Sequence, residues 1–305
     1  MRRISVPIKN SLKIFASKFS MVYSILLYLV IATVVLASVS VFALIPVYRF
    51  LEAEGVTAKA GDVITKLVIN GYSSELFDQV VECLERIAEV MRARSDLVVL
   101  TVLYFTLFIG LFCRLVYGML ELPMLKKIKG AMSDNADYGF IGLYVSCFGK
   151  SFIFSLCKIM LKILSDTLVL LGVLFLSKAL MFSSAKILIP FIDCVILVAY
   201  FTFSHCVTAC WGASVATDGR SMFGSLKLSW KIFFSESARV YGTFVITAFL
   251  LLGINFFIAR YTFGAGIIIS LPVSIYLVYI LDMTYFYTKR GYRYYVAGEI
   301  AGEER

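Results

Sequence analysis

Residues 21–45 read MVYSILLYLVIATVVLASVSVFALI, a stretch that contains no Asp, Glu, Lys or Arg. A helix rises about 1.5 Å per residue, so roughly 20 apolar residues cross the hydrocarbon core of a bilayer. The stretch therefore predicts a transmembrane helix, which Pro46 is expected to end. It is too long for the apolar segment of a signal peptide, and no convincing cleavage site follows it, so we interpret it as a retained first span.

The whole chain shares this apolar character. Of its 305 residues, 60% are hydrophobic and only 16% are charged, whereas about a quarter of the residues of a typical globular protein are charged. A soluble domain of this size still exposes roughly a quarter of the surface of its unfolded chain, so it could not hide so much apolar area. The composition predicts a protein that crosses the membrane several times.

Further apolar stretches complete the pattern. We predict spans at residues 97–122, 152–182, 187–211, 240–259 and 263–287. With residues 21–45 they give an all-α fold of six transmembrane helices, arranged as three hairpins. Pro123 is expected to end the second span, and the first two turns of the third span are expected to lie at the membrane interface.

The distribution of basic residues predicts the orientation of the chain. One side, made of 1–20, 123–151 with the start of the third span, 212–239 and 288–305, carries 19 Lys and Arg residues, whereas the two short turns opposite carry three. Both termini are therefore expected on the cytoplasmic side of a bacterial plasma membrane. The net charge of +9 is not gathered in one basic domain, so no nucleic-acid partner is expected.

The loop 46–96, on the predicted outer side, contains nine acidic residues against six basic ones. Five of its apolar residues recur at spacings of three and four, which predicts one face of a helix. These residues are Leu76, Val80, Leu84, Ile87 and Met91. The helix could run unbroken into the second span. About 50 residues are too few for a catalytic domain, so the loop is predicted to cap the bundle or to meet a partner.

A short motif occurs twice, as KIFASKFSMVY at 13–23 and as KIFFSESARVY at 231–241, with six identical residues in eleven positions. Each copy combines an apolar stripe with lysines off the stripe and leads directly into a span. The stripes are Ile8, Leu12, Phe15 and Phe19, and Phe223, Leu226, Trp230 and Phe233. A basic amphipathic helix of this kind lies in the membrane interface. We predict one within 1–20 and one within 212–239, and a weaker third copy within 123–151. A lipid- or partner-recognition motif is the alternative, and a catalytic motif ranks last.

Basic residues next to the spans are candidates for contacts with anionic lipid headgroups on the cytoplasmic face. The predicted contacts are Lys9, Lys13, Lys18, Lys227, Lys231, Lys289, Arg290 and Arg293. The last three belong to the tail 288–305, where neighbouring tyrosines are typical of the aromatic belt of a membrane protein.

Ionisable residues inside spans are costly and therefore are candidates for a functional polar network. They are Arg114, Glu121, Lys162, Asp166, Asp193, His205 and Asp282. Lys162 and Asp166 can pair on one face of the third span, and Lys158 and Lys162 can extend toward the cytoplasm. Arg114 can reach Glu121 or an acid of another span. The bilayer centre lacks an obvious acid that could carry protons or Na⁺, which argues against an ion-coupled transporter.

The sequence contains no recognisable catalytic or cofactor motif: HExxH, GxSxG, Walker A and Rossmann glycine patterns are all absent. Cys206 and Cys210 share a helix face, and Cys113 is a conceivable third thiol, but structural zinc takes four ligands. We expect packed cysteines, no metal, no cofactor and no enzymatic activity.

The leading hypothesis is a non-enzymatic membrane scaffold or accessory subunit that interacts with lipids or with a membrane or cytoplasmic protein. The alternative is the membrane component of a transporter, a permease or lipid-handling subunit that works with a separate ATPase. A membrane-embedded enzyme ranks third. A polar cavity that reaches the middle of the membrane would favour transport, and a solidly packed bundle would count against it.

Overall fold

The computed structural model describes residues 2–71, 73–134, 136, 138–181, 186–296 and 299–301, of which residues 2–6, Asn70, Lys186 and Ala301 are described by their backbone alone. The predicted end of the third span at Phe182, the turn that follows it, and the end of the tail at 302–305 lie outside these residues. The chain divides into two compact units. Unit 1 comprises Met1–Val30, Leu115–Lys162 and Leu197–Arg305, and unit 2 comprises Ile31–Arg114 and Ile163–Ile196.

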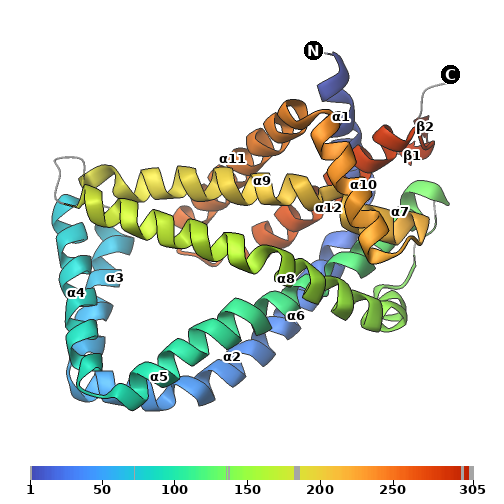
Figure 1. Ribbon diagram of the computed structural model, residues 1–305. Helices are drawn as coiled ribbons and strands as arrows, with labels where there is room; N and C mark the ends of the chain where they lie inside the picture. Colours follow the sequence, from blue (N-terminus) through green and yellow to red (C-terminus); the bar gives the residue numbers. More distant parts are fainter. Residues whose placement is uncertain are drawn as a thin grey trace. The chain divides into compact units, whose positions relative to one another are not determined.

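The described chain is helical apart from one small hairpin (Figure 1). Its helices are α1 (Arg2–Ser17), α2 (Met21–Ala53), α3 (Val56–Asn70), α4 (Ser74–Arg92), α5 (Ser95–Leu103), the π-helix η1 (Tyr104–Cys113), α6 (Arg114–Gly118), α7 (Glu121–Ser133), α8 (Phe140–Leu180), the 3₁₀ turn η2 (Lys186–Leu188), α9 (Ile189–Asp218), α10 (Met222–Ser235), α11 (Ser237–Tyr261) and α12 (Ile267–Arg290). The strands β1 (Tyr294–Val296) and β2 (Glu299–Ala301) pair antiparallel.

Six helices in the described residues are long and apolar enough to cross a membrane, which confirms a multi-pass membrane protein. They are α2, the run 95–133, α8, α9, α11 and α12. Two predicted boundaries differ from the structure. α2 continues through Pro46 to Ala53, because a membrane helix tolerates the one backbone hydrogen bond that proline removes. The second candidate span does not end at Pro123 either, because the run 95–133 includes it. Pro123 lies in the first turn of α7, where its missing N–H costs nothing.

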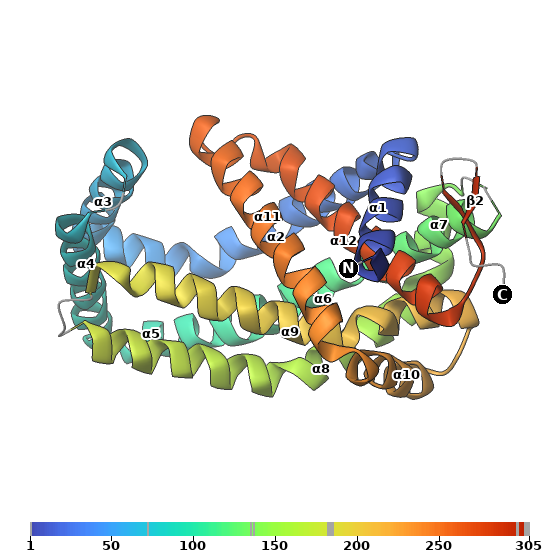
Figure 2. The ribbon, with the colours of Figure 1, turned by 90° about the horizontal axis from the view of Figure 1, so that it is seen from above.

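α12 is the central helix of unit 1. Half of its most apolar stretch is buried, against 11–17% in the other five candidate spans. Its inward residues recur at helical spacing, with Tyr276, Ile280, Met283 and Phe286 fully enclosed. α1, α7 and α11 pack against it, and Figure 2 shows α11 and α12 as an antiparallel hairpin. A helix buried on this scale forms the core on which the polar groups of unit 1 are positioned.

α1 is amphipathic, as predicted, but its buried face is Pro7, Ser11 and Ile14. Hydrogen bonds hold this face against α12. The Ser11 and Thr284 hydroxyls lie 2.6 Å apart, and just after the end of α1 the Lys18 carbonyl accepts a hydrogen bond from the Tyr276 hydroxyl at 3.0 Å. Two residues of the predicted stripe, Leu12 and Phe19, are exposed, whereas Ile8 and Phe15 are partly buried against the core. The sequence could not show that a buried serine would fix the rotation of this helix.

Part of the tail 288–305 forms the β hairpin. Tyr294 and Val296 of β1 are buried in the core of unit 1, and the Asn10 amide donates to the Tyr294 hydroxyl at 2.7 Å. Tyrosine and valine favour strands that are half buried against other elements. The hairpin therefore anchors the tail to α1 and α7, both of which β1 contacts.

The weaker third copy of the repeat is not a separate helix. α8 runs unbroken from Phe140 to Leu180, across the expected boundary at 151/152. No proline interrupts residues 140–180, and glycines at 142 and 149 alone do not end a helix. A separate short helix therefore precedes a candidate span only in the two copies that share sequence, where α1 precedes α2 and α10 precedes α11.

Unit 2 contains the long acidic loop as a pair of helices, α3 and α4, which lie side by side in Figures 1 and 2. The predicted helix is α4, whose N-terminus is capped by the Ser73 side chain. It ends before Arg94 and does not run into the second span. Lys59 of α3 and Glu82 of α4 form an exposed ion pair at 2.7 Å. Leu84, which belongs to the predicted apolar face, is exposed, whereas Cys83, outside that face, is buried.

Candidate functional site

The interior of unit 1 contains an ion pair between Glu121 and Lys158. Glu121 is the first residue of α7, where its negative charge complements the positive end of the helix dipole. Lys158 Nζ lies 2.5 Å from Glu121 Oε2, and both side chains are mostly buried. Lys158 thus points to a carboxylate inside the bundle, whereas we expected it to extend toward the cytoplasm. Pairing with Glu121 is favoured over extension of Lys158 to water, because the buried Glu121 carboxylate would otherwise be left without a counter-charge.

Gly212 of α9 makes room for this ion pair. A Cβ atom at position 212 would lie 2.8 Å from Glu121 Oε1 and 2.7 Å from Leu125 Cδ1, so both side chains would have to shift to accommodate it. The ring of Phe154 lies nearby, with its centroid 4.9 Å from that of Trp211 and 5.7 Å from Lys158 Nζ. Small residues allow such close helix approach in membrane proteins. The carboxylate is therefore fixed by the backbone of α9 as well as by its charge partner.

A second polar pair joins α9 to α12. His205 Nε2 lies 2.9 Å from Asp282 Oδ1, and the Asp282 side chain is only 1% exposed. Asp282 Oδ2 is buried and has no hydrogen-bond partner among the residues that the structure describes. Phe244 of α11 packs against the imidazole at a centroid distance of 5.4 Å. Half of the carboxylate is thus unsatisfied inside a candidate span, which is costly.

The two pairs of unit 1 lie close enough to influence each other electrostatically. Asp282 interacts electrostatically with Glu121 and Lys158 as well as with His205. Of the predicted network, unit 1 therefore contains His205 and Asp282 as one pair and Glu121 in another, whose partner Lys158 was not part of the predicted network. The sequence indicates Lys158 as a member of a polar face, because it lies four residues before Lys162 and eight before Asp166. It does not indicate that Glu121 is the partner of Lys158, because that depends on which helices are neighbours.

Two further polar pairs lie inside unit 2. Arg114 Nη2 is 2.5 Å from Asp166 Oδ2, and the Asp166 side chain is almost completely buried. Arg114 thus meets an acid of another span and not Glu121, the first partner we considered. Near the opposite end of α8, the Ser177 hydroxyl donates to Asp193 Oδ2 at 2.7 Å. The predicted intramembrane acids therefore all have at least one polar partner.

Lys162 and the cysteines add no further site. Lys162 is half-buried on α8 and interacts electrostatically with Cys206, and its predicted pairing with Asp166 stays a prediction. Cys206 and Cys210 are buried in the core of unit 1, whereas Cys113 belongs to unit 2. Within the described ranges, no three His, Cys, Asp or Glu side chains come together in a way that could hold a metal ion.

Comparison with known proteins gives no relative. No family model, curated protein or solved structure matches the chain. Function must therefore be inferred from the residues of this chain and their surroundings.

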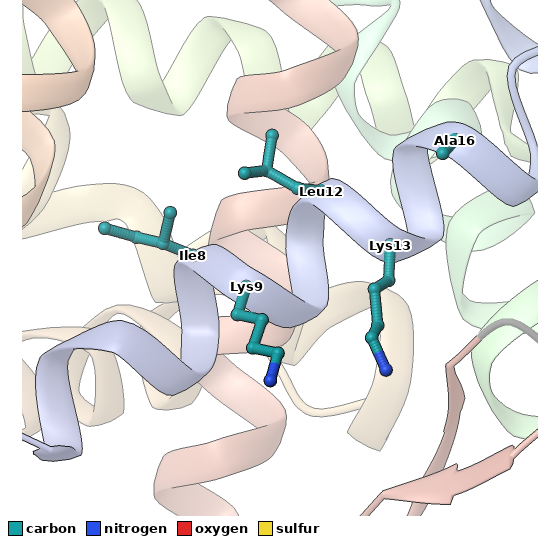
Figure 3. A pocket seen from close by; sticks show the side chains of 5 residues that line it. All are labelled: Ile8, Lys9, Leu12, Lys13 and Ala16. Atoms are coloured by element: carbon teal, nitrogen blue, oxygen red, sulfur yellow. The ribbon is translucent and has the colours of Figure 1, made fainter.

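The outward face of α1 is basic and apolar. Lys9 and Lys13 are exposed one turn apart, and their side chains extend away from the same side of the helix (Figure 3). Together with Ile8, Leu12 and Ala16 they line a shallow surface hollow of about 580 Å³. No carboxylate in the described part of the chain pairs with either lysine. Because the opposite face is fixed on α12, this side of α1 is free to contact lipid or protein.

α10 has a similar outward face, but its apolar residues are aromatic. Phe223, Trp230 and Phe234 are 79%, 41% and 68% exposed, and the exposed Lys227 and Lys231 lie between them. Two residues of the predicted stripe turn inward instead: Phe233 is buried in the core of unit 1 and Leu226 packs on the Trp211 cluster. The predicted stripe was therefore wrong at Leu226 and at Phe233, and in each case the next residue, Lys227 or Phe234, faces outward instead.

The basic residues of the tail have protein partners. Lys289 forms an ion pair with Glu236, and Arg290 Nη2 lies 3.8 Å from Asp218 Oδ2. The Lys289 ammonium, which donates a hydrogen bond to Glu236, holds the pKa of that carboxyl below its usual value. Arg293 is exposed. Among the predicted headgroup contacts, Lys289 and Arg290 thus connect helix ends. Those on α1 and α10 face outward, and Lys18, which follows α1, is half-buried.

Proposed function

We propose that this protein is a non-enzymatic multi-pass membrane protein that acts as a scaffold or accessory subunit through protein or lipid interactions. The arrangement of charges in the described residues supports this proposal. Charged groups inside the candidate spans face one another in pairs, as in Glu121–Lys158 and Arg114–Asp166. Paired charges of this kind stabilise helix contacts and leave few polar groups available for a substrate.

The outward faces of α1 and α10 carry the proposal. Each of these short helices has its inner face fixed in the core of unit 1 and presents exposed lysines beside exposed apolar side chains. A surface of this composition is typical of contact with another macromolecule or with a membrane surface. The excess of basic residues on the same side of the chain favours the cytoplasmic face of a bacterial plasma membrane for both helices and both termini.

Affinity purification of the full chain in mild detergent tests this function. We expect a membrane or cytoplasmic protein, or bound anionic lipid, to co-purify and to be lost from K9E/K13E or K227E/K231E. The matched control is K150E/K178E, which reverses two exposed charges on α8. Purification of the chain without any protein or lipid would overturn the proposal, as would an unchanged partner in both charge-reversed variants.

A second candidate is the membrane component of a transporter that works with a separate ATPase. The observation that favours it concerns Asp282. His205 contacts only its Oδ1, and its buried Oδ2 has no hydrogen-bond partner among the described residues. Unsatisfied acids inside spans often mark substrate or ion pathways. The purification distinguishes the two functions, because a co-purifying ATPase whose activity depends on Asp282 would replace the scaffold by the transporter.

A further inference from the structure

α10 is held at a membrane surface by its neighbours in the chain. α9 ends at Asp218 and α11 begins at Ser237, and both are candidate spans. The short helix between them, Met222–Ser235, therefore lies where two consecutive spans leave and enter the bilayer. Its position at the interface follows from chain connectivity alone, so the remaining question is which of its faces meets the lipid.

Hydrogen bonds on the inner face of α10 fix its rotation. The Ser229 hydroxyl donates to the Val207 carbonyl of α9 at 2.9 Å, and the Trp211 indole donates to the Met222 carbonyl at 2.8 Å. Ser225 is fully buried against Ser214, with their hydroxyl oxygens 3.2 Å apart. A helix anchored by contacts at both its first and third turns cannot roll freely. The residues on the opposite side are therefore presented outward in a fixed register.

The outward residues form one continuous stripe. Phe223, Lys227, Trp230, Lys231 and Phe234 follow one another at spacings of four, three, one and three, which places them on a single face. At about 1.5 Å per residue the stripe is roughly 16 Å long. It contains no acidic residue, and the nearest acid in sequence, Glu236, is paired with Lys289. Aromatic rings thus alternate with positive charges that have no carboxylate partner in the described chain.

We propose that this stripe binds the headgroup layer of anionic lipid, with Trp230 and the two phenylalanines at the acyl boundary and Lys227 and Lys231 on the phosphates. The occupant is lipid rather than protein because the chemistry matches that of the interface. Indole and phenyl rings settle at the level of the glycerol backbone, and long lysine side chains extend from there to phosphate. This assignment rests on the proposed function, a scaffold that interacts with proteins or lipids, and it names anionic lipid as the partner of the outward face of α10.

The chain offers a direct probe, because it contains only two tryptophans. Trp211 is buried against Phe154, whereas Trp230 is 41% exposed in the stripe. Subtracting the emission of the W230F variant from that of the wild type isolates Trp230 without altering Trp211. The full chain is reconstituted in nanodiscs of zwitterionic lipid with a minority of anionic lipid. Bromine atoms, which quench indole fluorescence on contact, are placed on either the anionic or the zwitterionic component.

We expect bromine on the anionic lipid to quench Trp230 well beyond the mole fraction of that lipid. Each lysine near a membrane surface corresponds to an enrichment on the order of fivefold, so two lysines give a clear excess. The excess should disappear in K227Q/K231Q and persist in K150Q/K178Q. Quenching in proportion to mole fraction in the wild type overturns the proposal, as does a Trp230 that only a water-soluble quencher such as iodide reaches.

The outcome also separates this proposal from the function on which it rests. If the lipid preference is absent but K227E/K231E abolishes co-purification of a protein, the stripe binds that protein and the scaffold function stands. If the lipid preference is present and no protein co-purifies with the chain, the anionic membrane surface is the partner. Circular dichroism of K227Q/K231Q, expected to match the wild type because both lysines are exposed, shows that a change in quenching does not come from unfolding.

Discussion

Glu121 of α7 and Lys158 of α8 form a buried ion pair whose carboxylate lies directly against the backbone of α9. The pair therefore connects three helices of unit 1 with one contact. Gly212 is what permits this arrangement, because a Cβ at that position would be 2.8 Å from the carboxylate. Pairing satisfies both charges in a setting where either alone would be expensive.

The G212A variant should be destabilised even though alanine is the better helix former. In an unconstrained helix, replacement of glycine by alanine stabilises by roughly 0.5–1 kcal/mol. At position 212 the new methyl group would instead displace Glu121 and Leu125, and overpacking of this kind typically costs about 1–3 kcal/mol. The matched control is G172A on α8, where nothing lies within 4 Å of the added Cβ. Thermal unfolding in detergent measures both, and a G212A protein as stable as G172A would contradict the close approach.

The Glu121–Lys158 pair should behave as a coupled unit. E121Q or K158M alone leaves one partner buried without its counter-charge, and we expect a loss of about 3–5 kcal/mol for each. E121Q/K158M removes both charges, so its loss should be clearly smaller than the sum of the single losses. The control is R86M in the exposed Arg86–Glu89 pair of α4, for which a loss of at most about 1 kcal/mol is expected. Additive losses would show that the pair is not coupled.

How far the sequence predicts this structure depends on the range of the interaction. The six spans were found because each is set by its own hydropathy: the predicted 240–259 and 263–287 correspond to α11 (Ser237–Tyr261) and α12 (Ile267–Arg290). α3 was not predicted. Its sequence VTAKAGDVITKLVIN is rich in β-branched residues and contains Gly61, all of which lower helix propensity. Its helical state follows from packing on α4, which no local pattern reveals.

Partner choice within the candidate site was the other part that the sequence could not supply. Arg114, Glu121, Lys158 and Asp166 were all visible as ionisable residues in or beside spans, and their costs inside a membrane imply pairing. Whether Arg114 meets Glu121 or Asp166 depends on which helices are neighbours and on their relative heights. The rotation of α1 has the same origin, because it is fixed by the contact between Ser11 and Thr284.

The His205–Asp282 pair predicts an asymmetric response to mutation. D282N keeps a carbonyl oxygen for the imidazole and removes a buried charge with one unsatisfied oxygen, so we expect a change within about 1 kcal/mol. H205F removes the only described hydrogen-bond partner of a carboxylate that is 1% exposed, and we expect a loss of about 3 kcal/mol or more. Unfolding of both variants in the same detergent shows which of the two substitutions causes the larger loss of stability. A larger loss for D282N than for H205F would mean that the carboxylate charge is itself required.

The ion pair between Glu236 and Lys289 predicts a pH dependence of stability. Lys289 holds the pKa of Glu236 below its usual value, with Arg239 as a second contributor. The folded pKa lies below the unfolded one, so the contribution is fully present above the unfolded value of about 4.3 and is lost as the pH falls through the folded value. We expect the wild type to exceed E236Q in stability by at most about 1 kcal/mol at pH 7, because Glu236 is partly exposed. This difference in stability should vanish in strong acid. The stability advantage of the wild type over K289Q should vanish over the same pH range. A wild-type advantage over E236Q that survives below the folded pKa would show that Glu236 acts through packing and not through its charge.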